Sequence, residues 1–292
     1  TLNLDARPLD DPRAYKLFSS ANTSAVFQLG SRGMRGLLKR PQPDRFGDII
    51  ALVAPYRPGP MDLIPSYCER KHGRERVNYP DPRVESILSE TYGIMIYQEQ
   101  VMQMAQIIGG YSLGAADLLR RAMGKKLPEE MAQQRQIFRE GAEKNGLKQF
   151  KADEIFDLME KFAGYGFNKS HAAAYALVAY QTAYMKAHHP AAFMAANMSA
   201  VMADTDKVQQ LFDDSAQNGL KILPPDVNSS AYRFAPLDAQ SIRYGLGAIK
   251  GTGEAAITHI VEERGRNGPF RDLFDFCHRV DKRIVNRRTV ES

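Results

Sequence analysis

Cysteine is scarce in this chain, and long apolar runs are absent. The 2 cysteines, Cys68 and Cys277, lie far apart and form no CxxC pair. That spacing disfavours a structural zinc site or a disulfide framework and is typical of a reducing cytoplasm. The longest apolar run, residues 172–180, is too short to cross a bilayer, and the polar, acidic N-terminus lacks the features of a signal peptide. We therefore expect a cytoplasmic protein that makes no membrane contact.

Positive charge is in only modest excess. The 39 Lys and Arg residues against 34 Asp and Glu give a net charge of +5 over 292 residues. Overall charge is thus a weak argument for nucleic-acid binding, and local clusters must decide the question. A hydrophobic share of 43% allows a sizeable core, which excludes a disordered tail. Because there is no initiator Met and no closing signal at the C-terminus, we expect a piece of a longer protein.

Paired carboxylates are missing as well. No Asp-x-Asp lies on a predicted strand, and two-metal phosphoryl transfer needs such a pair. Acidic residues such as Glu90, Glu99 and Asp117 look scattered, and Asp213 and Asp214 fall on a predicted surface helix where solvent is expected around them. The sequence therefore predicts no metal site.

Helical patterns dominate the first 220 residues and predict a mainly α fold. We expect an ordered loop at 56–67, a strand or tight turn at 21–29, and helices at 11–20, 98–108, 113–124, 128–145, 152–162, 170–188, from Pro190, and 205–218. Ser112 and Ser170 are the N-cap candidates for two of these helices. After Gly219, short strands are expected at 220–223, 232–237 and 241–246, followed by a different helical unit.

A glycine-bounded loop precedes the predicted helix at 170–188. It delivers Asn168, Lys169, Ser170 and His171 to the helix start, where unpaired backbone N–H groups and the helix dipole favour an anion. Lys169 adds a full positive charge. These features predict an anion site suited to phosphate; the alternative is an ordinary capped helix after a glycine turn.

Basic residues cluster at the end of the predicted helix at 113–124. Four cations fall close together there: Arg120, Arg121, Lys125 and Lys126. Long cationic side chains at a helix end can grip several phosphate oxygens, although a solvated basic face at a helix C-terminus is the competing interpretation. A smaller group lies in residues 31–40, where Arg32, Arg35 and Lys39 share one helical face.

Residues 246–264 predict a short helix, a tight turn and a longer helix. Gly251, Thr252 and Gly253 form the turn, where glycine allows backbone N–H groups to approach a phosphate, and Lys250 adds charge. This is the helix-hairpin-helix pattern, which grips a duplex backbone without reading its sequence; a simple helical hairpin is the alternative. Residues 271–291 look like the start of a second such unit.

Long and unusual motifs now identify a family. The chain closely resembles the bacterial replicative DNA polymerase III alpha subunit, of polymerase family C, and the resemblance rests on VFQLGSRGM, YRPGPMD, TYGIMIYQEQVMQMA, GYSLGAADLLRRAMGKK, FAGYGFNKSHAAAYA and LKILPPDVNSS. These motifs follow the family's order over nearly the whole chain. Gly30 departs from the pattern, since an acidic residue is commoner there, and it is assigned no role.

The resemblance implies a domain division. Residues 1–20 would connect to a palm that is missing here, 21–218 would be the fingers domain, 219–245 a short β connection, and 246–292 the truncated start of a tandem helix-hairpin-helix region. The family's three palm aspartates bind catalytic Mg²⁺ and all lie outside this segment. The resemblance therefore implies an enzyme that is a DNA-directed DNA polymerase, but a segment that binds no metal, has no catalytic residue and is inactive alone.

The resemblance also implies ligands and partners. Nucleotide and triphosphate contacts fall to Arg120, Arg121, Lys125, Asn168, Lys169, Ser170 and His171. DNA-backbone contacts fall to Arg32, Arg35, Lys126, Lys250, Gly251, Thr252 and Gly253. The expected partners are primer-template DNA, dNTP, the rest of the polymerase chain and, through absent regions, the sliding clamp and other replisome subunits. A non-enzymatic helical module that binds the DNA backbone is the alternative function, and a helical protein-interaction scaffold is the third.

Overall fold

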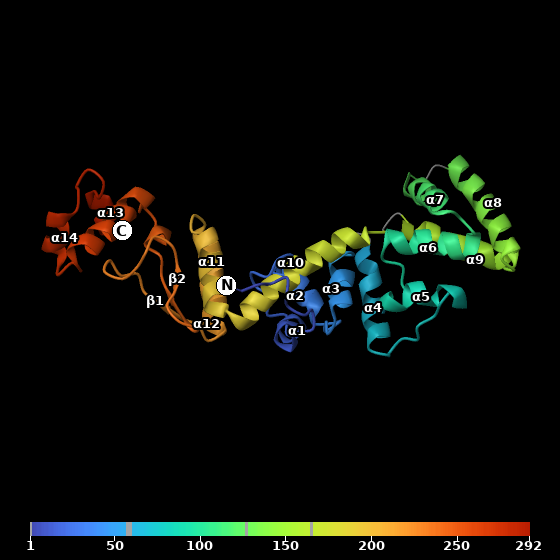
Figure 1. Ribbon diagram of the computed structural model, residues 1–292, viewed down its shortest axis with the longest axis horizontal. Helices are drawn as coiled ribbons and strands as arrows, with labels where there is room; N and C mark the ends of the chain where they lie inside the picture. The colour runs from blue at the N-terminus through green and yellow to red at the C-terminus, as the bar shows by residue number, and fades with distance from the viewer. Residues whose placement is uncertain (1, 57–59, 126–127, 164–165) are drawn as a thin grey trace. The chain divides into compact units, whose positions relative to one another are not determined.

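The computed structural model describes residues 2–56, 60–125, 128–163 and 166–292. Fifteen α-helices and a three-stranded sheet lie within these residues, which confirms the mainly α fold with a small β segment (Figure 1). The chain divides into two compact units. The first takes in Thr1–Asn22 and Ser31–Gln181, and the second takes in Thr23–Gly30 and Thr182–Ser292.

The first part of unit 1 consists of short helices. These are α1 (Pro12–Ser19), α2 (Arg32–Leu38), α3 (Phe46–Val53), α4 (Ile64–Lys71) and α5 (Glu85–Leu88), with 3₁₀ turns at Pro60–Leu63, Pro82–Val84 and Ser89–Thr91. The loop expected at 56–67 is wrong for its described C-terminal part, because residues 60–67 form a 3₁₀ turn and the first turn of α4. Proline is compatible with the start of a helix, where its missing N–H has no intrahelical partner. Residues 21–29 form tight turns and no strand.

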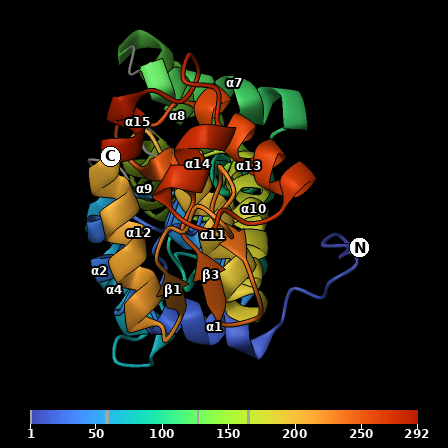
Figure 2. The ribbon, with the colours of Figure 1, turned by 90° about the vertical axis from the view of Figure 1, so that its left-hand side faces the viewer.

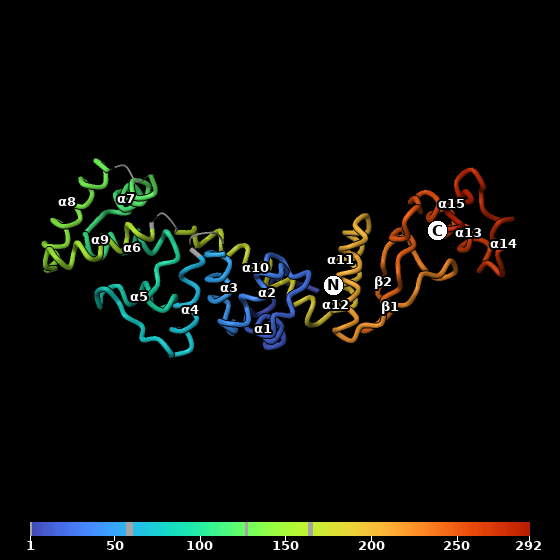
Figure 3. The backbone as a smooth tube through the Cα atoms, turned by 180° about the vertical axis from the view of Figure 1, so that it is seen from behind, coloured from blue at the N-terminus to red at the C-terminus, as the bar shows by residue number. Residues whose placement is uncertain are grey.

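Four longer helices form the other part of unit 1. They are α6 (Gln98–Gly109), α7 (Leu113–Lys125), α8 (Pro128–Lys144) and α9 (Gln149–Ala163), which pack against one another (Figure 3). Their common core includes Met104, Leu119, Phe138 and Phe156, all with 0% exposure. The helices α6 and α8 approach each other closely. A Cβ added at Gly141 of α8 would collide with the backbone carbonyl of Gly109 in α6.

The helix α10 (Lys169–His188) contains the boundary between the two units, which falls after Gln181. Unit 2 continues with α11 (Pro190–Ala200), α12 (Thr205–Gln217) and the strands β1 (Lys221–Leu223), β2 (Ala235–Pro236) and β3 (Ser241–Arg243). The strand order is β1-β3-β2, with β1 parallel and β2 antiparallel to β3. Both helices contact this sheet (Figure 2). Met194, Met198 and Ile242 belong to their common core.

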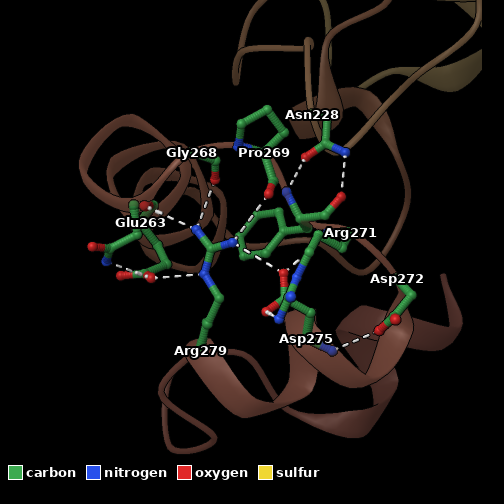
Figure 4. A network of polar contacts seen from close by, with 10 residues as sticks. Asn228, Glu263, Gly268, Pro269, Arg271, Asp272, Asp275 and Arg279 are labelled. Atoms are coloured by element: carbon green, nitrogen blue, oxygen red, sulfur yellow. Dashed lines mark hydrogen bonds and ion pairs between the residues drawn. The ribbon is translucent and has the colours of Figure 1, made fainter.

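The last part of unit 2 contains α13 (Glu254–Asn267), α14 (Leu273–Arg279) and α15 (Arg287–Glu291). The short helix expected from residue 246 is a 3₁₀ turn, Leu246–Ala248. Arg279 ties α14 to α13 from a central position (Figure 4): its Nε lies 3.0 Å from Glu263, its guanidinium donates to the carbonyls of Gly268 and Pro269, and it stacks 4.3 Å from the Phe270 ring. In the described part of the chain, no helix combines the length and apolar character needed to span a bilayer.

Candidate nucleotide and DNA-binding sites

The C-terminal half of α7 carries most of the predicted triphosphate contacts. The Oγ of Ser112 accepts the N–H of Ala115 at 3.2 Å, which confirms this serine as the cap. At the other end, the helix runs to Lys125, one residue beyond the predicted end. Lys126 lies outside the described residues, so its prediction as a DNA contact is untested.

Asp117 organises the two arginines of this helix. Its Oδ1 accepts hydrogen bonds from Nη2 and Nε of Arg120 at 2.7 and 3.0 Å. Its Oδ2 lies 2.8 Å from Nη2 of Arg121. The hydrogen bond from Arg120 holds the pKa of Asp117 below its usual value, with the charge of Arg121 as a smaller cause. The Arg121 side chain is 62% exposed, and Lys125 is exposed with no carboxylate partner among the described residues. These two cations are therefore open to a ligand from solution.

The segment before α10 pairs with the segment before α6. The N–H of Phe167 donates to the carbonyl of Ile96 at 3.1 Å, and the N–H of Gln98 donates to the carbonyl of Phe167 at 3.0 Å. These two bonds form a parallel bridge at Tyr97 and Phe167. Two motifs that are far apart in the sequence, TYGIMIYQEQ and GFNKSH, thus form one local structure.

Carboxylates already occupy the start of α10. Glu99 accepts the backbone N–H of Lys169 at 3.0 and 3.1 Å and the side-chain N–H of Asn168 at 2.9 Å. Glu90 pairs with the ammonium of Lys169 at 2.6 Å, and that ammonium lies 5.4 Å from the Tyr97 ring. The helix start does attract an anion, as its dipole requires, but the anion present is a carboxylate. Glu90 and Glu99 are therefore not scattered, as the sequence suggested, because the fold brings both to Lys169.

Asn168 is the N-cap of α10. Its Oδ1 accepts the N–H of His171 at 2.8 Å, and the helix begins at Lys169. The prediction that Ser170 is the cap is therefore wrong; Ser170 is exposed within the first turn. His171 is also exposed, and its ring lies 4.4 Å from the Tyr175 ring.

Gln98 of α6 contacts both the helix α7 and the segment before α10. Its side-chain Nε2 donates to the carbonyl of Gly166 at 3.0 Å, and its Oε1 accepts from Arg120 Nη1 at 3.4 Å. The structure thus connects the two predicted nucleotide-binding segments through a residue that sequence reasoning missed. Nothing in the spacing of Gln98 signals this, since its partners are remote in sequence.

The predicted DNA contacts on α2 differ from each other. The Nε of Arg35 donates to the carbonyl of Ala21 at 3.3 Å, so this half-buried side chain helps to hold α1 and α2 together. Arg32 is exposed and has no carboxylate partner in the described ranges. Of the two, Arg32 is the one whose charge is accessible.

The turn before α13 has the geometry expected of a glycine hairpin. Gly251 adopts φ +101°, a conformation that favours glycine. The hydroxyl of Thr252 donates to the carbonyls of Leu246 and Ile249, both at 2.8 Å, which fixes the turn. Gly253 precedes the first residue of α13, where no side chain caps the helix, and Lys250 is exposed beside the turn.

Metal binding finds no support in the described residues. No group of three or more His, Cys, Asp or Glu side chains there could hold a metal ion. Asp214 is not solvated as predicted: it is buried on α12 and pairs with the buried Lys186 at 2.8 Å. An ion pair of this kind has both charges satisfied within the protein and leaves no open ligand.

Comparisons with known proteins agree with this architecture. The family profile of the "Bacterial DNA polymerase III alpha subunit finger domain" matches residues 1–146, and that of a "Helix-hairpin-helix motif" matches residues 219–292. The second match confirms the expected helix-hairpin-helix character of the C-terminal part. The loop before α10 lies between the two matched ranges.

Similar proteins cover the chain from end to end. DNA polymerase III subunit alpha of Xylella fastidiosa (strain Temecula1) is 62% identical over 292 residues, which is 100% of this chain and 24% of the relative. The Neisseria meningitidis serogroup B protein of the same name is 60% identical over 98% of this chain and 25% of its own length. The Escherichia coli K12 protein is 57% identical over 99% of this chain and 26% of its own length.

The chain spans about a quarter of the length of the curated relatives it matches. The finger-domain profile accounts for residues 1–146 of its 292, and the identity to these relatives extends over all or nearly all of it. The chain therefore belongs to the bacterial DNA polymerase III alpha subunit finger-domain family.

Proposed function

We propose that this chain is the fingers portion of a replicative DNA-directed DNA polymerase and positions the incoming dNTP and the template for nucleotidyl transfer. The observation that carries the proposal is the link through Gln98 between the basic helix α7 and the start of α10. Within it we propose the division inferred from the sequence: a palm connection at 1–20, fingers at 21–218, a β connection at 219–245 and helix-hairpin-helix residues from 246.

The triphosphate would meet the exposed cations of α7 first. Arg121 and Lys125 are accessible, and Arg120 is less exposed and contacts Asp117 and Gln98. Cations preorganised around a triphosphate stabilise the charge that develops during transfer. Asn168, Lys169, Ser170 and His171 would form the facing wall of the pocket. A phosphate could reach the Lys169 ammonium and N–H only in exchange for Glu90 and Glu99.

The chemical step would belong to residues outside this chain. The family resemblance implies Mg²⁺ held by palm aspartates, and the described residues do not fit that role because they contain no suitable ligand cluster. What this chain would supply is orientation of the substrate and electrostatic stabilisation of its phosphates. We accordingly propose that these 292 residues are inactive by themselves.

The DNA backbone would be held by a different set of groups. Lys250 and the Gly251–Thr252–Gly253 turn offer a charge and backbone N–H groups, and Arg32, Arg35 and Lys126 would add contacts elsewhere. Such contacts fix the position on the duplex and carry no sequence information. The proposed partners are primer-template DNA, dNTP, the remaining polymerase chain, the sliding clamp and other replisome subunits. We propose the cytoplasm as the location, in line with the bacterial polymerase relatives and two free cysteines.

A chimeric subunit tests this proposal. The chain replaces the matching segment of the Xylella fastidiosa relative, to which it is 62% identical, and primer extension is measured for the chimera and for the chain alone. The proposal predicts extension by the chimera and none by the chain. Extension by the chain alone would refute the assignment, and so would a folded chimera that binds neither dNTP nor DNA.

A further inference from the structure

The first turn of α6 contains two adjacent residues, Gln98 and Glu99, whose partners lie on α7 and on the segment before α10. Gln98 uses its backbone N–H, its amide nitrogen and its amide oxygen for three different partners: Phe167, Gly166 and Arg120. An amide is suited to this position because it is neutral and carries a donor nitrogen beside an acceptor oxygen at the end of the side chain.

Glu99 fastens the same segment from the next position. Its carboxylate receives the N–H of Lys169 and the amide of Asn168. With the backbone bonds of Phe167, every residue from Gly166 to Lys169 bonds to residues 96–99. The start of α10 is therefore fixed relative to α6, and Arg120 of α7 is bonded to the same turn.

From this arrangement we propose that Gln98 is a positioning residue for the nucleotide triphosphate. It holds Arg120 of α7 and the Gly166–Lys169 segment at a fixed separation, so that both can face one triphosphate. The inference rests on the proposed function, since it assigns Gln98 to the same site. The physical reason is that small displacements of substrate-binding groups have large effects on rate, up to about 100-fold for a shift near 1 Å.

Three substitutions in the chimeric polymerase separate the contacts. Gln98→Met keeps the length of the side chain and removes both polar groups. Gln98→Glu keeps an acceptor for Arg120 but cannot donate to Gly166. Gln133→Met is the matched control, because Gln133 is exposed on α8 and has no hydrogen-bonded side-chain partner among the described residues. Each variant is first compared with the wild type by thermal unfolding.

The expected result is a loss of kcat/KM for dNTP of about tenfold in Gln98→Met, in line with the loss of one or two hydrogen bonds. Gln98→Glu should lose activity too, through the Gly166 contact, and Gln133→Met should match the wild type. A double-mutant cycle gives the decisive readout: if Gln98 acts through Arg120, the loss in Gln98→Met/Arg120→Ala is smaller than the product of the single losses.

Two results would overturn the inference. The first is a kcat/KM for both Gln98 variants within twofold of the wild type. The second is a double variant whose losses multiply, since a purely structural role of Gln98 would leave Arg120 independent. Should Gln98→Met fail to fold, the cycle is run with Gln98→Ala, which also removes the acceptor for Arg120. Failure of the proposed function looks different, because Arg121→Ala would then leave the dNTP kinetics unchanged.

Discussion

The carboxylate of Glu99 accepts the backbone N–H of Lys169 at 3.0 Å, although the two residues are far apart in sequence. The helix start that sequence reasoning identified as a phosphate site thus already holds an anion from its own chain. A nucleotide phosphate can occupy that position only by displacing this carboxylate. The helix dipole does favour an anion at this position, but the sequence does not reveal which anion is present.

Glu99→Gln should destabilise the start of α10. The substitution removes the negative charge from the helix N-terminus and leaves one of the N–H donors with a poorer acceptor. We expect a loss of about 0.5–1 kcal/mol in the free energy of unfolding, measured by urea denaturation. Glu143→Gln is the control, because Glu143 lies exposed near the C-terminal end of α8. A Glu99→Gln variant as stable as this control would contradict the stabilising contact of Glu99 with the start of α10.

Gly141→Ala should disrupt the packing of α8 on α6. An added Cβ would overlap the carbonyl of Gly109, and overpacking of this kind costs about 1–3 kcal/mol. Gly114→Ala in α7 is the matched change, because a Cβ there meets nothing within 4 Å. Alanine is the better helix former by about 1 kcal/mol, so Gly114→Ala should be neutral or stabilising. Thermal unfolding of both variants checks this, and equal midpoints would be inconsistent with the close approach.

Acid should weaken the C-terminal part of unit 2 through Asp275. Hydrogen bonds from the backbone and side chain of Arg271, with a further one from Arg279, lower the pKa of Asp275 from 3.8 to about 2. A pKa that is lowered in the folded state gives stability that is present above pH 3.8 and is lost as the pH falls toward 2. Asp275→Asn should therefore flatten the decline of the unfolding midpoint over that window. Asp206→Asn, on the exposed first turn of α12, should follow the wild type; a parallel decline in both variants would count against the network.

Binding of duplex DNA by the chain should depend steeply on salt if the backbone is gripped. Replacing Lys250 by Ala should weaken binding uniformly across sequences and reduce the slope of log K against log salt by about 1. Lys221→Ala is the control in the same unit, since Lys221 is an exposed lysine in β1. Fluorescence anisotropy over a range of salt concentrations gives both slopes. An unchanged slope for Lys250→Ala would remove this residue from the proposed contacts.

Local signals in the sequence predicted most of the helices. Ser112 caps the start of α7. Gly146, with φ +77°, follows the end of α8. Both features depend on neighbouring residues only. The prolines of residues 56–67 predict a loop, but Pro65 lies in the first turn of α4, where proline is compatible with a helix. Sequence patterns of this local kind fix where helices begin and end.

Tertiary contacts decided what the sequence could not. Asn168 and Ser170 are both good capping residues. In the structure Asn168 is the cap of α10, and its side chain also donates to Glu99. The burial of Asp214 depends on Lys186, which lies on another helix. The role of Gln98 depends on partners on α7 and before α10. None of these pairs is visible in a periodic pattern, since each joins residues far apart in the chain.

The dNTP dependence of Arg121→Ala in the chimeric polymerase tests the central claim most directly. Arg121 is an exposed arginine paired with a carboxylate, and Arg74→Ala is its matched control because Arg74 is exposed and pairs with Glu69 at 2.7 Å. Loss of a charged phosphate contact should raise the KM for dNTP or lower kcat/KM by about tenfold or more. Arg74→Ala should behave as the wild type. Identical dNTP kinetics for the two variants would contradict the assignment of α7 to the triphosphate.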